Sequence, residues 1–493
     1  MREPMMTSQF LATIAKNKER MDLQSYKHIH CIGIGGIGIS GVVKFLQAKG
    51  VSVSGSDVKQ SMITDGCVAF GIPVSIGHAV ENIPEETDLV VYTEAAPEEN
   101  VERAEAARRN IPQMGHFDFL GELSKDYRTI CITGTNGKST TTAMTAAIFE
   151  AAGFDPTVFV GSIVPGWPLG NVRVGKSDWL IIEGDEYKRK MLALHPEITV
   201  ITNVEMDHLD CYADLADIEA AFAQLGRQTQ KTVWITMDMQ HRCIYLCDGT
   251  AKIGIFGYEM MPSCFVSLAE PTPSVARYFG EGTQSLDILE PDGVMNPAKK
   301  LGTVTLHLPG EFNMMNALAA KAVSLECGIS LDVICRALEK FPGIWRRFER
   351  VGTFNGAQII SDYGHHPAAI RGTLAGAREF FPNKRIVLLF EPHHHNRTRE
   401  LFDDFVTSFE GADVLILSEI YGVLGRDSEE DAAMSSTLLL DAVKASSKAP
   451  KESHYAANLP EAEAVLRSVI QEGDVVIVMG AGDVDVVARN LVA

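Results

Sequence analysis

One short segment, Gly134-Thr135-Asn136-Gly137-Lys138-Ser139-Thr140, has the residue types that hold the phosphates of a nucleotide. It follows an apolar run at 129–133, which predicts a strand, and it opens a helical pattern over 139–152. Glycines let backbone N–H groups close around phosphate oxygens, and the helix N-terminus adds partial positive charge. Lys138 would reach the β- and γ-phosphates and the Ser139 hydroxyl would bind Mg²⁺, although Ile132 replaces the usual first glycine. The segment therefore predicts a site for ATP and Mg²⁺ rather than a simple turn before a helix.

Two candidate metal ligands follow other apolar runs. The acidic stretch Glu183-Gly184-Asp185-Glu186 comes directly after the run at 179–182, and His208 lies just past the run at 198–201. Carboxyl ends of parallel strands face the ligand crevice of an α/β sheet. Each residue by itself is typical of a solvated loop, but a carboxylate and an imidazole beside a phosphate loop suit Mg²⁺. We therefore expect Glu183 and His208, together with Ser139, to hold the metal.

A second glycine loop lies near the start of the chain. It reads Gly33-Ile34-Gly35-Gly36-Ile37-Gly38, between a strand pattern at 28–34 and a helical pattern at 40–49. Ser56 and Asp57 follow the next strand pattern, where an acid that binds ribose is expected. NAD is the usual ligand of such a loop, a UDP group would use the same contacts, and a tight turn without a ligand stays open.

The last third of the chain is rich in basic and histidine-containing motifs. They are Arg346-Arg347-Phe348, Asp362-Tyr363-Gly364-His365-His366-Pro367 and Pro392-His393-His394-His395-Asn396-Arg397-Thr398. Histidine tracts suggest a metal, but these lack cysteine or carboxylate partners at metal-binding spacing. Contact with a substrate is the favoured interpretation, with ordinary polar loops as the alternative.

The elements that position these motifs alternate between apolar runs and helical patterns. This alternation predicts an α/β fold with parallel sheets covered by helices. Three such units follow one another, and we place the domains at 1–125, 126–342 and 343–493, with an extension at 1–25. Further strands are expected at 51–54, 88–92, 385–390, 414–417 and 475–479, helices at 398–409 and 460–470, and loops or hairpins at 263–298.

Bulk properties exclude some classes of protein. The 493 residues are 46% hydrophobic and 22% charged, as in soluble globular proteins of about three domains. The net charge of −20 argues against a nucleic-acid-binding surface. No apolar run is long enough to span a bilayer, and residues 1–24 do not resemble a signal peptide. Nine cysteines without a CxxC pair favour reduced thiols, hence a cytoplasmic location, and the oligomeric state stays open.

Taken together, the motifs resemble those of the Mur ligase family, over nearly the whole chain from about residue 27. The segments that carry the resemblance are 33–40, 133–140, 202–208, 309–318, 346–348, 362–367, and Pro392-His393 with Arg397-Thr398. The family implies a Rossmann-like N-terminal domain that binds UDP, a central ATPase domain and a Rossmann-like C-terminal domain. The branch that this chain most resembles uses ATP to join L-alanine to the carboxylate of UDP-N-acetylmuramate through an acyl phosphate.

The resemblance also implies roles for single residues. Lys138 and Arg347 would offset the negative charge of the reacting groups. Asn313 and Asn316 would contact adenine, and Asp362 the ribose. Muramate or the amino acid would lie against four residues, which are His365, His393, His394 and Arg397.

This chain departs from the family pattern at several positions. Asn136 and Ser139 stand where the family commonly has His and Thr, and His394 where Arg is frequent. Glu186-Tyr187-Lys188-Arg189 differs from the usual acidic stretch. Several sister ligases also carry a carbamylated lysine about 15 residues after the metal-binding histidine, and the equivalent position here is Ala223.

Three alternatives remain. A sister ligase joins a whole tripeptide to UDP-N-acetylmuramate, and it shares the first two domains. An NAD-dependent oxidoreductase would use the first glycine loop and Asp57 but leave Lys138 without a role. A nucleotide-binding regulator without catalysis is disfavoured because Lys138, Glu183 and His208 are all present.

Overall fold

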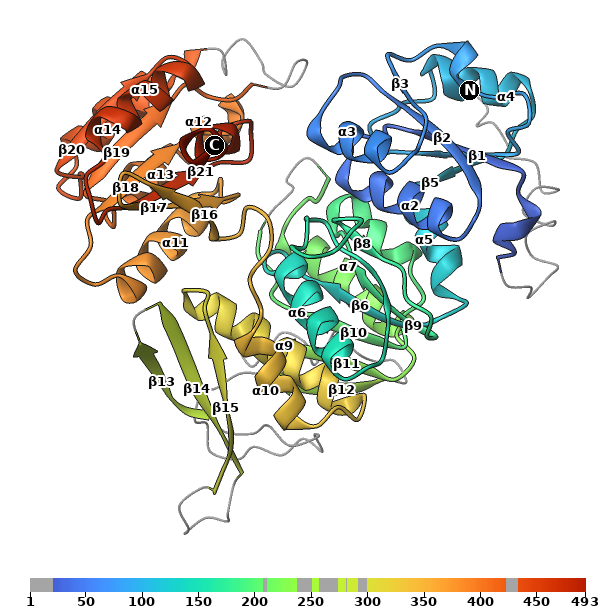
Figure 1. Ribbon diagram of the computed structural model, residues 1–493, viewed down its shortest axis with the longest axis horizontal. Helices are drawn as coiled ribbons and strands as arrows, with labels where there is room; N and C mark the ends of the chain where they lie inside the picture. Colours follow the sequence, from blue (N-terminus) through green and yellow to red (C-terminus); the bar gives the residue numbers. More distant parts are fainter. Residues whose placement is uncertain are drawn as a thin grey trace. The chain divides into compact units, whose positions relative to one another are not determined.

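The structure is a computed structural model that describes residues 21–206, 211–236, 251–256, 274–280, 282–290, 299–422 and 433–493. Within these residues the chain folds into sheets covered by helices, as the sequence predicts (Figure 1). Two compact units can be separated. The first contains the chain up to Lys138 together with Gly153–Gly161 and Gly166–Gly254, and the second contains Ser139–Ala152, Ser162–Pro165 and Ile255–Ala493. The two borders between the three expected domains remain a prediction, and most of the expected extension lies outside the described residues.

The first sheet of the first unit is parallel, in the order β3-β2-β1-β4-β5. This is the strand order of Rossmann-like folds, in which ligands bind at the carboxyl ends where the order reverses, here between β1 and β4. All residues of β1 are buried, as expected for a central parallel strand with helices on both faces. The strands are β1 (His28–Ile32), β2 (Ser52–Asp57), β3 (Val74–Ile76), β4 (Leu89–Tyr92) and β5 (Gln113–Gly115). The helices are η1 (Leu23–Ser25), α2 (Ile37–Ala48), α3 (Met62–Ala69), η2 (Val80–Asn82), α4 (Val101–Arg108) and α5 (His116–Ser124).

The second sheet has the order β12-β11-β10-β6-β9-β7-β8. Strand β6 lies between β10 and β9 and is parallel to both, so the carboxyl ends of these three strands lie side by side. The strands are β6 (Arg128–Thr133), β7 (Thr157–Phe159), β8 (Val172–Arg173), β9 (Trp179–Glu183), β10 (Ile198–Ile201), β11 (Thr232–Thr236) and β12 (Lys252–Phe256). The helices that follow them are α6 (Lys138–Ala151), η3 (Tyr187–Ala193) and α7 (Leu215–Gln228).

The second unit contains a small antiparallel sheet in the order β13-β14-β15. Its strands are β13 (Ser274–Gly280), β14 (Thr283–Glu290) and β15 (Lys299–Leu306), and the helices α9 (Glu311–Glu326) and α10 (Leu331–Glu339) follow. The β13–β14 pair confirms the hairpin expected within 263–298 for the described part of that stretch.

The large sheet of the second unit has the order β16-β17-β21-β18-β19-β20, parallel except for β16. One face packs on a core that includes Phe390, Phe405 and Phe409, and the other on a core of Val, Ile, Leu and Ala side chains. The strands are β16 (Glu349–Phe354), β17 (Ala357–Asp362), β18 (Ile386–Phe390), β19 (Val414–Ser418), β20 (Glu452–Ala456) and β21 (Val475–Met479). The helices are α11 (Pro367–Phe380), α12 (His395–Glu400), α13 (Phe402–Ser408), α14 (Ser436–Ala445), α15 (Leu459–Val469) and α16 (Asp485–Val492).

Most of the elements predicted from the sequence occur within two or three residues of the expected bounds. The single helix predicted at 398–409 is wrong. Leu401 leaves the helical backbone, with φ −108° and ψ 23°, and divides the segment into α12 and α13. Among the helices of the described residues, none combines the length and the apolar character that crossing a membrane requires.

Candidate nucleotide and substrate sites

The loop after β6 is shaped by glycine. Gly134 has φ +131°, and a Cβ atom there would lie 2.2 Å from Thr202 Oγ1. A side chain at this position is therefore excluded by both the backbone conformation and the close approach of the segment after β10. The predicted phosphate loop thus has the strand before it and the helix α6 after it that the sequence indicated.

The segment after β10 supports this loop. Thr202 Oγ1 donates to Asn136 O at 2.5 Å, and Asn203 Nδ2 donates to the same oxygen at 2.9 Å. In return, Asn136 N donates to Asn203 Oδ1 at 2.9 Å and Thr135 N donates to Asn203 O at 3.0 Å. Asn203 was not among the predicted site residues, although its place just after an apolar strand beside β6 was a usable signal.

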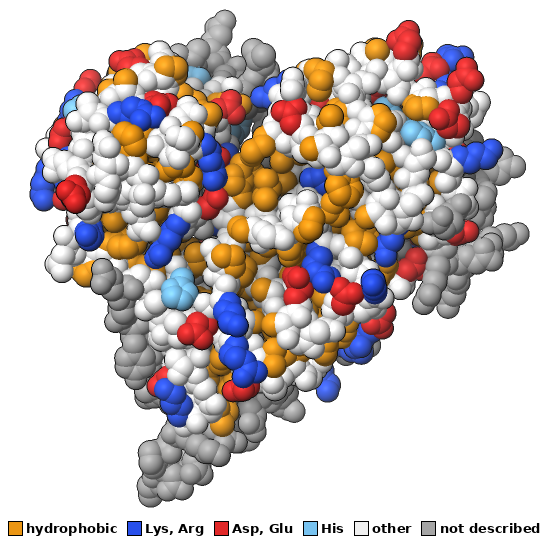
Figure 2. All heavy atoms as spheres, viewed as in Figure 1, with side chains coloured by type: hydrophobic (Ala, Val, Ile, Leu, Met, Phe, Trp, Pro, Cys, Tyr) orange, Lys and Arg blue, Asp and Glu red, His pale blue; other side chains and the backbone are white. Residues whose placement is uncertain are grey.

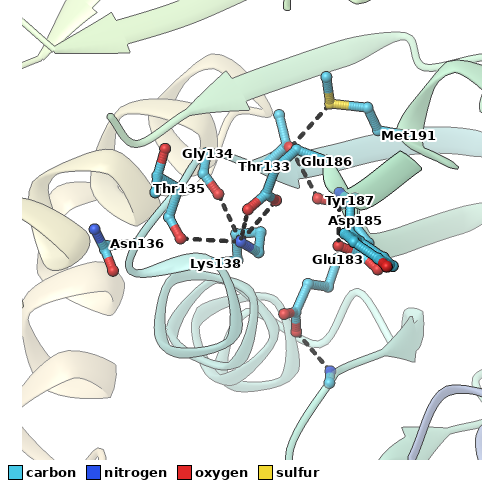
Figure 3. Close-up of polar contacts among 12 residues, drawn as sticks. Thr133, Gly134, Thr135, Asn136, Lys138, Glu183, Asp185, Glu186, Tyr187 and Met191 are labelled. Atoms are coloured by element: carbon cyan, nitrogen blue, oxygen red, sulfur yellow. Dashed lines mark hydrogen bonds and ion pairs between the residues drawn. The ribbon is translucent and has the colours of Figure 1, made fainter. Parts of the chain in front are cut away.

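Lys138 is held by oxygen acceptors of its own loop and of Glu186 (Figure 3). Its Nζ lies 2.7 Å from Gly134 O, 3.0 Å from Thr135 O and 2.7–2.8 Å from the two carboxylate oxygens of Glu186. Glu186 is 2% exposed, and its backbone oxygen accepts a hydrogen bond from Tyr212 at 2.5 Å. Because an ammonium group has three donors, a phosphate oxygen would have to replace one of these acceptors. Glu186 is a functional candidate that the sequence reasoning missed.

Glu183 ends β9 and is paired with Ile132 of β6, two residues before the phosphate loop. Its Oε2 accepts from Gly161 N at 2.5 Å, and Figure 3 shows this carboxylate apart from the Lys138–Glu186 pair. A carboxylate at this strand end suits a hard cation such as Mg²⁺. Ser139 and Thr140 lie buried in the first turn of α6. His208 lies outside the described residues, and within those residues no group of three or more His, Cys, Asp or Glu side chains is arranged to hold a metal.

Asp185 carries its charge close to the same loop. Burial by itself raises the pKa of Asp185, but Lys190, whose Nζ lies 2.8 Å away, and Lys138 lower it overall. The carboxylate is therefore ionised at neutral pH. Lys138 pairs with Glu186 and Lys190 with Asp185, so two of the three acidic side chains near the end of β9 are neutralised by a lysine.

The first glycine loop closes on the end of β2. Gly33 has φ +83°, and a Cβ atom there would lie 2.3 Å from Thr93 Cγ2, so only glycine fits. Ser56 O accepts from Gly33 N at 2.8 Å and from Ile34 N at 3.0 Å. Asp57 Oδ2 accepts from Gly35 N at 2.8 Å. Ser56 and Asp57 therefore shape the loop itself.

The remaining glycines of this loop are also closely packed. Gly36 N donates to Gly33 O at 3.0 Å, which closes the turn before α2. A Cβ atom on Gly38 would lie 3.0 Å from His116 Nε2. Burial, helped by Lys190, lowers the pKa of His116 to about 4, so this imidazole is neutral at pH 7.

A buried polar network lies behind Ser56, whose side chain is 0% exposed. Ser56 Oγ donates to Glu102 Oε2 at 2.5 Å and lies 3.1 Å from His78 Nδ1. Burial by itself raises the pKa of Glu102, but hydrogen bonds from His30, Ser56 and Asn82 bring it down to about 2. The Ser56 hydroxyl is thus engaged inside the domain, and its link to the glycine loop is through its backbone oxygen.

In the second unit, the two arginines of the Arg346-Arg347 pair differ in environment. Arg346 is 7% exposed and donates to the backbone oxygens of Gly480 and Gly482, after β21. Arg347 is exposed, and its guanidinium lies 4.9 Å from the Tyr363 ring centroid. Arg347 is therefore the one of the two that presents its charge to solvent.

Asp362 ends β17 and is 8% exposed. Its Oδ2 accepts from Phe348 N at 2.8 Å and its Oδ1 from Gly364 N at 2.7 Å. Burial raises the pKa of Asp362, while Arg347 and these two N–H groups oppose the rise. The two oxygens thus hold the backbone of two segments, at Phe348 and at Gly364, and the predicted ribose contact would be made in addition to these bonds.

The structure brings three of the predicted substrate residues together. The ring of His393 lies 5.8 Å from His365 and 4.2 Å from His394, and it stacks on Tyr421 at 5.3 Å. Burial, helped by Arg397, lowers the pKa of His365 to about 3, so this ring is neutral at pH 7.

His394 and Arg397 are held at the start of α12. His394 is 9% exposed and has φ +70°, an unusual backbone conformation for a residue with a side chain. Arg397 Nη1 lies 3.5 Å from His393 O. The backbone of the loop after β18 thus determines the positions of the His394 and Arg397 side chains.

The two predicted adenine contacts lie near the start of α9. Asn313 is 4% exposed and its Nδ2 donates to Pro309 O at 2.7 Å. Asn316 is 6% exposed, with its Nδ2 3.5 Å from Asn313 Oδ1. The amide of Asn313 therefore helps to hold the turn before the helix.

Charged side chains of both signs are mixed on the surface of the described residues. On the face of the described residues that Figure 2 draws, Lys and Arg side chains are interspersed with Asp and Glu, without a broad basic patch. This distribution is typical of a solvated protein surface.

Known proteins match this chain over its three parts. Residues 28–128 match the Mur ligase family catalytic domain, 132–324 the Mur ligase middle domain, and 346–482 the Mur ligase glutamate ligase domain. Two curated relatives are the UDP-N-acetylmuramate–L-alanine ligases of Salinibacter ruber, 35% identical over 96% of this chain and 95% of its own, and of Clostridium kluyveri, 36% identical over 94% and 97%.

Solved structures agree. The UDP-N-acetylmuramate–alanine ligase of Thermotoga maritima has a TM-score of 0.79 at 29% identity, over 94% of this chain and 98% of its own. A murein peptide ligase of Psychrobacter arcticus shares the fold, with a TM-score of 0.65 at 21% identity, over 94% and 98%. The resemblance read from the motifs is thereby confirmed, and the chain belongs to the Mur ligase family.

Proposed function

We propose that this protein uses ATP to join L-alanine to the carboxylate of UDP-N-acetylmuramate, a step of peptidoglycan synthesis. Relatives with that activity in their names match almost the whole chain at 35–36% identity. The observation that carries the proposal is the placement of Glu183 at the end of β9, paired with β6, the strand that leads into the glycine loop before Lys138. Family membership removes the NAD-dependent oxidoreductase, which rested on the first glycine loop alone.

The proposed reaction has two steps. A carboxylate oxygen of the muramate attacks the γ-phosphorus of ATP, the bond to the β,γ-bridging oxygen breaks, and ADP leaves. The amine of L-alanine then attacks the acyl carbon of the acyl phosphate and loses a proton. Collapse of the tetrahedral intermediate expels inorganic phosphate and leaves the amide.

The first step brings two anions together, so the site must supply positive charge. Lys138 is proposed for this role, and its release from Glu186 would accompany nucleotide binding. Glu183, Ser139 and the undescribed His208 are proposed to hold Mg²⁺, which when bound supplies positive charge at the phosphate oxygens. Gly134, Thr135, Asn136, Gly137 and Thr140 are proposed to surround the phosphates through backbone N–H groups and the helix terminus.

Substrate recognition is proposed for two further groups of residues. The loop with Gly33, Gly35, Gly36 and Gly38, shaped by Ser56 and Asp57, is proposed to bind the UDP group at the start of α2. In the second unit, Arg347, Asn313, Asn316 and Asp362 are proposed to contact the nucleotide, and His365, His393, His394 and Arg397 the muramate or the amino acid. We propose domain borders near 125 and 343, and a cytoplasmic location because ATP and the nucleotide sugar are found there.

A phosphate-release assay tests the proposal. Release should require ATP, Mg²⁺, UDP-N-acetylmuramate and L-alanine together, and the Lys138→Ala variant should lower kcat by about 10²-fold or more, because one preorganised contact to a transition state contributes about 3 kcal/mol. Glu205→Gln is a matched control, since it removes one exposed carboxylate beside the same loop, 3.2 Å from the Asn136 side chain, and leaves the contacts of Lys138 in place. A higher rate with the tripeptide than with L-alanine would assign the chain to the sister ligase instead.

A further inference from the structure

Asn171 joins two sheets of the first unit. It lies just before β8, and its side chain is 1% exposed. Its Nδ2 donates to Ile37 O at 2.5 Å and to Ser40 Oγ at 3.1 Å, and its Oδ1 accepts from Lys44 Nζ at 3.0 Å. All three partners belong to α2, more than 120 residues earlier in the chain. One buried amide therefore fixes this helix to the second sheet.

The contacted turn is the functional end of α2. Ile37 is the first residue of the helix and belongs to the first glycine loop. The N–H groups of this turn would face a diphosphate bound at the loop. Helix α2 and the segment around Asn171 lie close together, since a Cβ atom on Gly41 would lie 3.1 Å from Asn171 Nδ2. The rings of Phe45 in α2 and Phe159 in β7 also pack against each other, with their centroids 5.4 Å apart. A movement of this turn would therefore displace the side chain of Asn171.

The backbone of Asn171 leads to the candidate metal ligand. Its carbonyl oxygen accepts from Val160 N at 3.0 Å. The next residue, Gly161, donates its N–H to Glu183 Oε2 at 2.5 Å. A Cβ atom on Gly161 would lie only 2.8 Å from Glu183 Oε1, so the carboxylate rests directly on this backbone. Contacts thus run without a break from the first turn of α2 through Asn171 to Glu183.

We propose that Asn171 is a positioning residue that couples the first glycine loop to Glu183, so that binding of the nucleotide sugar and binding of Mg²⁺–ATP strengthen each other. The inference rests on the proposed function, which supplies both ligands. A ligand that orders the first turn of α2 also restrains Asn171 and, through Val160 and Gly161, the Glu183 carboxylate. The second ligand then binds a site that is already ordered, which is positive cooperativity, and linkage makes the effect equal in both directions.

Calorimetric titration of the full chain measures this coupling without turnover. The affinity for a non-hydrolysable ATP analogue with Mg²⁺ is determined with and without saturating UDP-N-acetylmuramate, and the ratio of the two dissociation constants is the coupling factor. Linked sites typically give roughly 5- to 150-fold. For the wild-type protein we expect a factor in that range.

Three variants locate the coupling. Asn171→Asp keeps the size and an oxygen for Lys44 but turns an oxygen instead of a donor toward Ile37 O, so the factor should fall toward one. Gly161→Ala displaces the Glu183 carboxylate from the other end, so it should lower the factor and raise the Mg²⁺ concentration for half-saturation. Lys44→Met is the matched control, because it leaves both donor contacts of Asn171 Nδ2 in place and should keep the factor within about two-fold of the wild type.

The outcomes are distinguishable. A lowered factor in Asn171→Asp and Gly161→Ala, with the factor retained in Lys44→Met, supports the coupling. If circular dichroism shows that Asn171→Asp does not fold, the result for Gly161→Ala decides. A coupling factor in Gly161→Ala equal to that of the wild type then overturns the inference. A wild-type chain that turns over but shows no coupling overturns the inference and leaves the proposed function intact. A wild-type chain that neither turns over nor binds UDP-N-acetylmuramate overturns the proposed function, and the inference with it.

Discussion

Glu391 gives the second unit a dependence on pH that can be tested directly. It follows β18 and is 4% exposed. Its Oε2 accepts a hydrogen bond from Val484 N at 3.3 Å. The same oxygen packs on Gly482, where an added Cβ atom would lie only 2.2 Å from it. Burial raises the pKa of Glu391 to about 7, Asp483 adds to the rise, and Arg346 opposes it. The carboxyl group therefore gains its charge near neutral pH, inside the fold.

The sign of the effect follows from proton uptake. Between pH 4.5 and about 7 the folded protein keeps the Glu391 proton while the unfolded chain has released it, so the free energy of unfolding falls as pH rises through this window. At about 1.4 kcal/mol per pH unit, the loss by pH 8 amounts to about 3 kcal/mol. Glutamine has the shape of the protonated carboxyl and no charge. Glu391→Gln should therefore gain about 3 kcal/mol over the wild type between pH 4.5 and 8.

Differential scanning calorimetry of both proteins at several values from pH 5 to 8 measures this difference. For a unit of this size, the Tm of Glu391→Gln relative to wild type should rise by several degrees over the range. The control is Glu410→Gln, since Glu410 forms an exposed ion pair with Lys448 at 2.8 Å and such pairs contribute about 0–1 kcal/mol. A Tm difference for Glu391→Gln that is the same at pH 5 and pH 8 would refute the reasoning, because it would mean that the buried carboxyl does not change its charge on unfolding.

Three other predictions concern activity. Glu186→Gln removes the charge that holds Lys138, so KM for ATP should fall several-fold in the phosphate-release assay; an increase in KM would show that Glu186 assists the nucleotide instead of competing with it. His394→Arg supplies the planar, bidentate group that imidazole lacks, so KM for L-alanine or UDP-N-acetylmuramate should change by about a few-fold while KM for ATP stays constant; three unchanged KM values would place His394 outside the site. Ala223 is 6% exposed in α7 and cannot form a carbamate, so activity should not respond to bicarbonate after CO₂ depletion, and rescue by bicarbonate would point to a carbamylated lysine elsewhere.

The sequence by itself determined the features whose residues lie close together along the chain. The phosphate loop could be identified because its glycines, Lys138 and the flanking strand and helix are all within about 25 residues. The strands at 198–201 and 475–479 were placed with the bounds that the structure shows, because each is a continuous apolar run ended by polar residues or glycine. The division of 398–409 into two helices was missed, since nothing in the type of Leu401 marks a change of backbone angle.

The tertiary structure alone decided which distant segments meet. Glu186 reaches Lys138 across 48 residues, Asn203 reaches Asn136 across 67, and Asn171 reaches Ile37 across 134. In a parallel sheet, neighbouring strands are joined by long crossovers, so the order of strands, and with it the set of side chains at each carboxyl edge, is a global property of the chain. The burial of Glu391 and the contrast between Arg346 and Arg347 arise in the same way. Local residue types show which groups are capable of the chemistry, and the packing of the sheets sets their partners, their burial and hence their charge.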